Sequence, residues 1–525
     1  RVKETVSISN KYPQIIFCFT TRPSFFKKEI SGIQKEFISE NGNVSATELF
    51  EKYIKYYNVN ITNKTVLKYS LTTPLSLKLF CELYQDKTLQ FNDKSDVSLP
   101  KLLTEKISLI DAEFANFAKT NIKNQYILQT IKVLAEWFIV NHSIEYNELV
   151  DMIKNKLSIE NSLSTNIIEY LEKYGILNCY CEHSNDPFEG KKYIYSTGIQ
   201  SYFDHAMTIN VLNRYDNPSE IDFNDFKYLG INALYSLAVV SIISYDYLIT
   251  QNQTLGQVVD ESTLAEIQYW ALRHSPDKVA ITFVDTIMES MKKSSNLLYI
   301  ATNRIILPLA RNKAHPLGVS LLNKYLESFD KPAKRDLFWS PIGYLKDSYG
   351  KRWSRNSSLE LEDYPLNQDD TADGLPTIYA WALSTLNNSL REFYRNELMK
   401  WAIQKPIDFF NLFVMFSNVN DAQILTDLFS ILMCLVYEIN NVELTTLSFD
   451  WVSKNILSKS KIDSNRSIAI RYYSIAIVHK AVELSICDAS VSKNFLPPYS
   501  ANNNYIKISK EALAGTRMGG YKGIT

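Results

Sequence analysis

The stretch LPKLLTEKISLIDAEFANFAK, residues 99–119, decides the class of fold. Its apolar residues recur at intervals of three and four, which places them on one side of an α-helix. They are Leu102, Leu103, Ile107, Ile110, Phe114 and Phe117. Similar stripes cover most of the chain, while glycine and proline number only 15 and 16 in 525 residues. Few helix breakers and long amphipathic runs together predict a mainly α fold.

Helical patterns also lie on either side of this stretch. They cover residues 46–57, 75–84, 126–140, 145–157 and 163–173. The last pattern ends at Gly175, a residue that readily adopts the left-handed conformation found after many helices. Two strand-like runs follow, 176–182 and 192–196, separated by a turn-rich segment. Three helices and a hairpin predict a winged helix.

From Gln200 to the end of the chain, helical stripes recur without a convincing strand. The candidate helices are 231–248, 261–273, 278–291, 297–309, 317–329, 376–403, 421–438 and 466–486. An acidic loop interrupts them at residues 353–375. This pattern predicts α-solenoid-like helical repeats whose consensus has degenerated.

The N-terminal region has a different character. Residues 15–20 form a short, continuous apolar run that is typical of a strand buried in a parallel sheet. A single buried strand needs neighbours, which we expect upstream of this chain. The run therefore indicates the remnant of an α/β core, and the chain is expected to be a fragment.

Composition and charge limit the classes of function. The 56 Lys and Arg residues balance the 57 Asp and Glu residues, so the formal net charge is −1. A near-neutral chain offers no overall electrostatic attraction to nucleic acid or to a membrane surface. The six cysteines have no framework spacing, and no run of 18 apolar residues occurs. We expect a reduced protein that does not span a membrane.

The motifs of nucleotide hydrolysis are missing from the sequence. A phosphate-binding loop requires Gly-x-x-x-x-Gly-Lys-Ser/Thr, and no such segment is present. No apolar strand ends in an acidic pair. The sequence thus predicts no ATPase activity for this chain alone. Arg22, however, follows directly after the buried run, at the sheet edge where ligands bind in α/β folds. Its guanidinium either contacts a terminal phosphate or pairs with a neighbouring carboxylate.

Three segments carry a resemblance to a known family. Residues 16–23 (IFCFTTRP) look like the sensor 1 strand of NACHT and related STAND signalling ATPases. Residues 72–81 (TTPLSLKLFC) are similar to the Gly-x-Pro segment that opens a helix of the family's helical lid. Residues 193–203 (YIYSTGIQSYF) resemble the end of the family's winged helix. Their order and spacing agree with the family.

The resemblance implies site residues and a cofactor. Arg22 would be the sensor 1 arginine near the γ-phosphate, and Pro74 would line the adenine side of the nucleotide pocket. Thr72 replaces the family's glycine, and Ser196 stands where a phosphate-contacting histidine is common, so the winged-helix contact is in doubt. The cofactors would be ATP and Mg, bound by the full-length ATPase. No catalytic or metal-ligating residue is assigned in this chain.

The resemblance also implies an organisation into segments. These are the end of an ATPase core at 1–30, a helical lid at 31–120, a winged helix at 121–215 and a helical-repeat sensor at 216–525. Residues 335–340 (RDLFWS) look most like the prokaryotic antiviral Avs group. That group implies a cytoplasmic protein that senses a phage protein, a large terminase or portal. Sensing would drive homo-oligomerisation and effector activation without membrane or nucleic-acid binding by this segment.

Two other readings of the whole chain stay open. One is a helical-repeat scaffold for protein interactions, with no nucleotide role. The other is a winged-helix DNA-binding regulator whose recognition helix would be residues 163–173. That helix has two glutamates and one lysine, which does not suit contact with phosphates.

Two side-chain clusters have alternative interpretations. Cys179, Cys181 and His183 alternate along a strand and suit either zinc or an ordinary wing. The second cluster suits a basic partner, a cation or, as we interpret it, a solvated acidic loop. It consists of Glu360, Glu362, Asp363, Asp369, Asp370 and Asp373.

Overall fold

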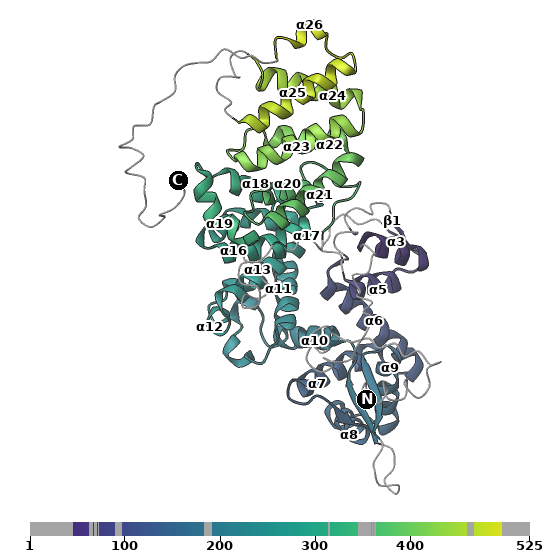
Figure 1. Cartoon of the computed structure of the whole chain (residues 1–525). Coiled ribbons are helices and arrows are strands. Elements are labelled where there is room, and N and C mark those ends of the chain that lie inside the picture. The colour runs from purple at the N-terminus through teal and green to yellow at the C-terminus, as the bar shows by residue number, and fades with distance from the viewer. Residues whose placement is uncertain are drawn as a thin grey trace, which may run out of the picture. The chain divides into compact units, whose positions relative to one another are not determined.

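The computed structural model describes residues 46–61, 67, 71, 73–89, 97–182, 192–312, 315–344, 359, 361, 364–458 and 467–495. The chain divides into two units, residues 1–52 and 53–525. Of the first unit only the beginning of helix α3 (Ala46–Tyr56) is described, and the expected strand at 15–20 lies outside the described residues. The second unit is mainly helical (Figure 1), so the predicted fold class is confirmed.

The first long helices of the second unit are α5 (Pro74–Leu83) and α6 (Leu99–Ala118). Both carry a proline in the first turn, where its missing N–H costs no hydrogen bond. Helix α6 ends at Lys119, which adopts a left-handed conformation with φ 52°. Two short strands, β1 (Asn60–Ile61) and β2 (Thr88–Leu89), pair in parallel. The helices predicted at 75–84 and 99–119 are therefore confirmed.

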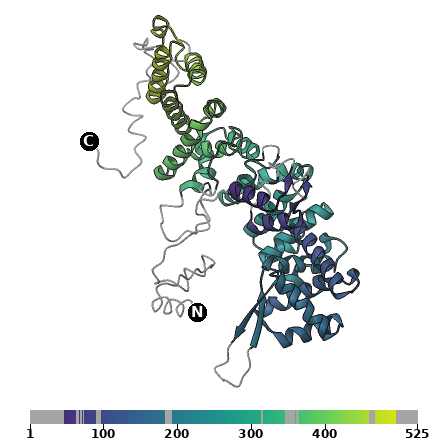
Figure 2. The same cartoon turned by 90° about the vertical axis from the view of Figure 1, so that its right-hand side faces the viewer.

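Three helices and a three-stranded antiparallel sheet follow, the sheet in the order β3–β5–β4. Figure 2 shows the hairpin of the two long strands. They are α7 (Tyr126–Val140), β3 (Ile144–Glu145), α8 (Tyr146–Leu157), α9 (Asn161–Lys173), β4 (Leu177–Glu182) and β5 (Lys192–Thr197). This is the outline that the sequence predicts for a winged helix. The strand β3 was not expected, because two residues carry no recognisable pattern.

Two glycines close the base of the hairpin. Gly175 has a φ of +66°, the left-handed conformation predicted for it after helix α9. A Cβ on Gly198 would lie 2.1 Å from the Gly175 carbonyl oxygen, so a side chain there would push the two backbones apart. The Gly198 amide donates to the Ile176 carbonyl oxygen at 2.8 Å. The sequence needs both glycines to join the strands at this point.

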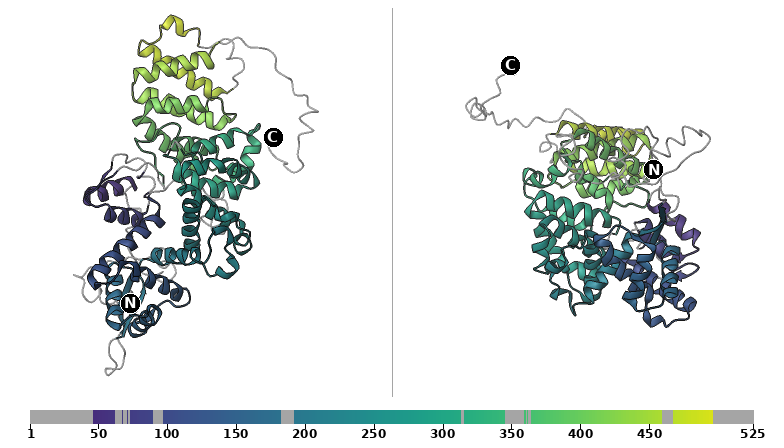
Figure 3. Two further views of the ribbon diagram at one scale, coloured as in Figure 1. Left: turned by 180° about the vertical axis from the view of Figure 1, so that it is seen from behind. Right: turned by 90° about the horizontal axis from the view of Figure 1, so that it is seen from below.

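The remainder of the second unit consists of helices in the described ranges (Figures 1 and 3). The longer ones are α10 (Gln200–Leu212), α11 (Ile231–Tyr245), α13 (Glu261–His274), α15 (Val284–Lys293), α16 (Ser295–Ala301), α18 (Val319–Glu327), α19 (Pro332–Tyr344), α20 (Leu375–Ala382), α21 (Asn388–Gln404), α22 (Pro406–Phe416), α23 (Ala422–Glu438), α24 (Val442–Asn455) and α25 (Ile468–Glu483). The short ones are η3 (Pro218–Glu220), η4 (Phe223–Phe226), η5 (Ile249–Gln251), α12 (Leu255–Val258), α14 (Asp277–Ala280), η6 (Ile281–Phe283), η7 (Thr302–Ile306), α17 (Leu307–Leu309) and α26 (Ala489–Ser492), with η2 (Ile122–Asn124) before α7.

Three predicted helices of this array differ in detail. The pattern at 376–403 is wrong as one helix: α20 and α21 are separate, and the Asn387 side chain caps α21 by accepting from the Leu390 amide at 3.1 Å. The pattern at 278–291 is also divided, into α14, η6 and α15. The helix at 297–309 is continuous but contains the π-helical turn η7 just before Pro308. Proline donates no hydrogen bond, which favours a widened turn.

Helices α10, α19, α22 and α24 were not among the predicted helices. Helix α22 shows why, since PIDFFNLFVMF is apolar on nearly every side and has no stripe. The ring centroid of Phe413 in this helix lies 4.8 Å from that of Phe429 and 4.8 Å from that of Trp451, so α22, α23 and α24 share one aromatic core.

None of the helices that the structure describes is both long enough and apolar enough to cross a membrane.

A buried arginine holds the middle of the array together. Arg335 of α19 is 1% exposed and donates to the Asp421 carboxylate at 2.6 Å and to the Asn420 side-chain oxygen at 3.0 Å. Its guanidinium carbon lies 5.1 Å from the centroid of the Trp381 ring. Asp421 also caps α23 by accepting from two backbone amides of its first turn. The segment RDLFWS therefore begins with a residue that joins three helices.

The interpretation of residues 360–373 as a solvated loop is wrong for Asp370. This carboxylate is 3% exposed and accepts from Arg311 at 2.7 and 3.0 Å. The Trp401 indole donates to the Asp370 carbonyl oxygen at 3.3 Å. Glu360, Glu362 and Asp363 lie outside the described residues. Asp370 thus forms a structural ion pair with Arg311, because a buried carboxylate requires a matching positive charge.

We expect Arg335→Ala to lower the free energy of unfolding by about 3–5 kcal/mol, because it leaves the Asp421 carboxylate buried and unpaired. Urea titration followed by circular dichroism measures the loss. Lys334→Ala is the matched control: its ion pair with Asp330 is exposed and should contribute at most about 1 kcal/mol. Equal effects of the two substitutions would contradict this assignment.

Candidate functional site at helix α6

The predicted nucleotide-binding residues are only partly described. Arg22 and Thr72 lie outside the described residues. Pro74 is exposed in the first turn of α5, where Thr73 and Ser76 form a capping box with a hydrogen bond of 3.1 Å from the Ser76 amide to the Thr73 hydroxyl. An exposed pyrrolidine ring suits contact with an apolar ring of a ligand. The nucleotide contacts of Arg22 and Pro74 stay predictions.

Helix α6 is attached to α5 by a largely buried ion pair. The Lys106 ammonium lies 2.9 Å from a Glu82 carboxylate oxygen, and the Lys106 residue is 7% exposed. The same ammonium lies 5.5 Å from the centroid of the Tyr174 ring at the end of α9. A buried ammonium needs such partners to offset its lost hydration. Lys106 therefore fixes α6 relative to both neighbours.

Aromatic contacts extend the interface between α6 and α9. The Tyr170 ring lies 5.2 Å from Phe114 and 5.3 Å from Phe117, both on α6. The Tyr174 hydroxyl donates to Glu113 of α6. Burial, together with this bond to a carboxylate, raises the pKa of Tyr174 well above its usual range. The hydroxyl is consequently a permanent donor, and it orients Glu113.

A second buried charge on α6, the Asp111 carboxylate, caps the first turn of α7. The Asp111 carboxylate accepts from the backbone amides of Ile127 at 2.7 Å and Leu128 at 3.2 Å. These amides belong to the first turn of α7, which has no side-chain cap of its own. Burial raises the pKa of Asp111 to about 6, although both hydrogen bonds favour the charged form.

Helix α6 also contacts α10 and α11 through a histidine that sequence reasoning missed. His205 of α10 is 1% exposed; its Nε2 lies 2.8 Å from the Thr104 hydroxyl of α6 and its Nδ1 lies 3.3 Å from the Ser236 hydroxyl of α11. Burial lowers the pKa of His205 to about 4, so the ring is neutral at pH 7. A single histidine in a helix gives no sequence signal of such a role.

The arrangement makes α6 the common contact of the α-helices α5, α7, α9, α10 and α11, and of the short helix η2. Only α11 lies within the predicted sensor at 216–525. Any displacement of α6 must disturb the hydrogen bonds and ion pairs that involve Thr104, Lys106 and Asp111. A displacement of α6 would therefore be felt by the helices that it contacts. The side chains of Thr104, Lys106 and Asp111 are engaged in these structural bonds.

Other chemistry is not apparent within the described ranges. No group of three His, Cys, Asp or Glu residues gathers there as a metal site requires. Cys179 and Cys181 lie on the wing strand β4, and His183 is outside the described residues. Burial raises the pKa of Cys81 to about 12, which makes it a poor nucleophile. Ser196 is paired in the sheet with Asn178.

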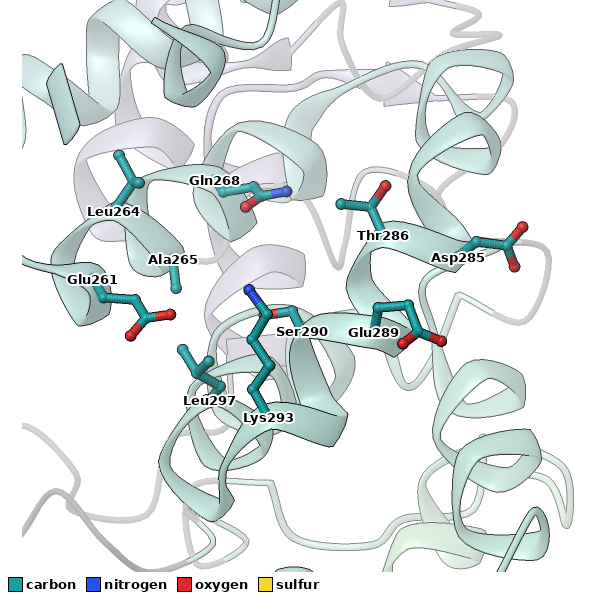
Figure 4. A pocket seen from close by; sticks show the side chains of 10 residues that line it. All are labelled: Glu261, Leu264, Ala265, Gln268, Asp285, Thr286, Glu289, Ser290, Lys293 and Leu297. Atoms are coloured by element: carbon teal, nitrogen blue, oxygen red, sulfur yellow. The ribbon is translucent and has the colours of Figure 1, made fainter. Parts of the chain in front are cut away.

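A surface hollow of about 520 Å³ lies between α13 and α15 (Figure 4). Its lining includes three carboxylates, Glu261, Asp285 and Glu289, one ammonium, Lys293, and Leu297 of α16. Glu289 is already paired with Lys292 at 2.7 Å. The lining therefore carries a net negative charge, and these residues alone do not define a ligand.

The chain matches no protein-family model, no curated protein and no solved structure.

We expect Asp111 to destabilise the fold progressively as the pH rises from about 4 to about 6. Its folded-state pKa of about 6 exceeds the ordinary value of 3.8, so the fold favours the proton, and this contribution is present at low pH and lost at high pH. Between pH 4 and pH 8, wild type should lose up to about 3 kcal/mol of unfolding free energy relative to Asp111→Asn.

Urea unfolding of both proteins at the two pH values measures this difference. The comparison removes the contributions of other titrating groups, since both proteins share them. A difference between the proteins that is the same at pH 4 and pH 8 would contradict the assigned pKa.

Proposed function

We propose that this chain is the C-terminal portion of a STAND-type signalling ATPase that senses a protein ligand. In this proposal residues 31–120 are the helical lid, 121–215 the winged helix and 216–525 the sensor. The observation that carries it is the position of α6, which contacts helices of all three segments. A switch that couples nucleotide to ligand needs such a shared element.

The proposed mechanism is a population shift. ATP and Mg would bind mainly to an upstream phosphate loop, where Arg22 supplies a positive charge to the terminal phosphate and Pro74 an apolar contact to the base. A ligand on the sensor shifts the equilibrium only through a higher affinity for the open state. The open, ATP-bound protein then assembles into a homo-oligomer and activates its effector.

The proposed setting is antiviral defence in the cytoplasm, with a phage large terminase or portal as the ligand. The sequence resemblance of residues 335–340 supports this choice. An array of stacked helices also offers extended surfaces suited to folded proteins. Arg335 itself is buried, so the segment would act through the shape of the array and not through direct contact.

A passive helical scaffold is the second candidate, supported by the continuous core that runs from Val211 to Val478. DNA binding has less support. Helix α9 exposes Glu169 and Glu172, and its one lysine, Lys173, lies 4.9 and 5.0 Å from the rings of Tyr170 and Tyr174. Carboxylates on a recognition helix repel phosphates.

In the protein that includes the phosphate loop, we expect Arg22→Ala to weaken ATP binding relative to ADP by about 1.5–3 kcal/mol. The reason is that only ATP carries the phosphate that this guanidinium contacts. Calorimetric titration with ADP and a non-hydrolysable ATP analogue measures both affinities. Pro74→Ala is the matched control, because a base contact is shared and both affinities should fall equally. An unchanged ATP-to-ADP ratio in Arg22→Ala would reject the proposed role.

We expect exchange of residues 216–525 with the matching segment of another sensor to transfer trigger specificity. The junction lies between α10 and η3, outside any helix, and the donor segment should keep a hydroxyl at the position of Ser236. Phage challenge of cells that carry the full-length gene measures the response. A chimera that still answers only to its original trigger places the sensor elsewhere. A chimera that no longer binds nucleotide would show that the exchange has damaged the nucleotide site, and its trigger response would not be interpreted.

A further inference from the structure

The junction of α6, α10 and α11 has one internally consistent pattern of hydrogen bonds. The Thr104 hydroxyl donates its single proton to the Pro100 carbonyl oxygen at 3.0 Å. It can therefore only accept from His205, so Nε2 carries the ring proton and donates at 2.8 Å. Nδ1 is then an acceptor, and the Ser236 hydroxyl donates to it at 3.3 Å. In this tautomer the neutral His205 ring has a hydroxyl partner at each nitrogen.

Helix α10 is bound to α11 at a second point. The Thr208 hydroxyl, one turn after His205, lies 3.2 Å from the Ala233 carbonyl oxygen of α11. Ala233 and Leu237 share a face of α11 and are 3% and 1% exposed. His205 therefore lies inside a dry interface, with one partner on each neighbouring helix (Figure 1 shows α10 near α11).

Among the residues that the structure describes, the hydrogen-bond partners of His205 are the hydroxyls of Thr104 and Ser236, and no carboxylate is bonded to the ring to stabilise its charged form. Helix α11 has no charged residue, and α10 has only Asp204, whose pKa burial raises. The charged residues on the other two helices packed against α10 are Lys101, Glu105, Lys106, Asp111 and Glu113 on α6, and Lys132 and Glu136 on α7. Lys106 and Asp111 are engaged with Glu82 and with α7, and Glu136 lies 3.4 Å from Arg214.

We propose that Thr104, His205 and Ser236 form a latch that holds α10 against α6 and α11, and that protonation of His205 releases it while the helical array stays folded. A second proton on Nδ1 turns the Ser236 hydroxyl from donor to acceptor, and it places a positive charge on a ring that is 1% exposed, where the lost hydration is not compensated by a hydrogen-bonded carboxylate among the described residues. The latch itself requires no nucleotide. Its consequence, separation of lid and sensor, rests on the proposed function.

Hydroxyl-radical footprinting of the complete chain at pH 7 and pH 4.5 tests the latch. Oxidation of Leu237 reports opening between α10 and α11, and oxidation of Leu432, which is 0% exposed in α23, reports unfolding of the array. With a pKa of about 4 when latched and about 6.5 when open, the open population should rise about 50- to 100-fold at pH 4.5. Leu237 should respond and Leu432 should not.

Three variants separate the latch from general acid sensitivity. His205→Gln keeps polar contacts but does not titrate, so Leu237 oxidation should no longer respond to pH. Thr104→Val removes the acceptor of the Nε2 proton and should raise Leu237 oxidation at pH 7 by about tenfold. Thr130→Val is the control: this buried hydroxyl bonds only the Tyr126 carbonyl oxygen of its own helix, and Leu237 should be unaffected.

Two outcomes overturn the proposal. One is a joint rise of Leu237 and Leu432 oxidation, which means that acid unfolds the whole unit. The other is a pH response of His205→Gln equal to that of wild type, which assigns the opening to other groups. Failure of nucleotide binding in the full-length protein would reject the proposed function but leave the latch intact.

Discussion

The packing of α5 and α7 on α6 depends on the need to satisfy two buried charges on α6. Lys106 and Asp111 are 7% and 5% exposed, and neither can remain charged in the interior without partners. Glu82 supplies the partner for Lys106, and the first amides of α7 supply the partners for Asp111. Because these partners lie on different helices, α5 and α7 can pack on α6 in only one register.

The helical array uses the same constraint at irregular points. Arg335 is paired with Asp421, and Arg311 with Asp370, each between segments far apart in the sequence. These pairs do not recur from one helical hairpin to the next, which is one reason why the repeat has no consensus. Each pair replaces apolar packing with a bond that only one geometry satisfies. Buried ionic groups of this kind favour a single arrangement over alternatives.

Helix α6 is the element of the structure on which the proposed function rests. In the proposed function, α6 would connect the nucleotide site to the sensor, because it contacts both α5 and α11. A junction made of hydroxyls and one neutral histidine is weaker than an ion pair. The polar contact of α10 with α6 is therefore weaker than the ion pair that joins α5 to α6. The proposed nucleotide-binding role of Arg22 lies outside the described residues.

Sequence and tertiary structure determined different parts of this protein. The stripe of residues 99–119, the outline of the winged helix and the turn at Gly175 follow from local periodicity and backbone preference, so the sequence predicts them directly. The division of 376–403 at Asn387 and the helix at 406–416 do not, because a cap and an all-apolar helix give no periodic signal. The roles of Asp370, Arg335 and His205 were decided only by packing. Their partners lie 59, 86 and 101 residues away, and no local pattern encodes a contact over such distances.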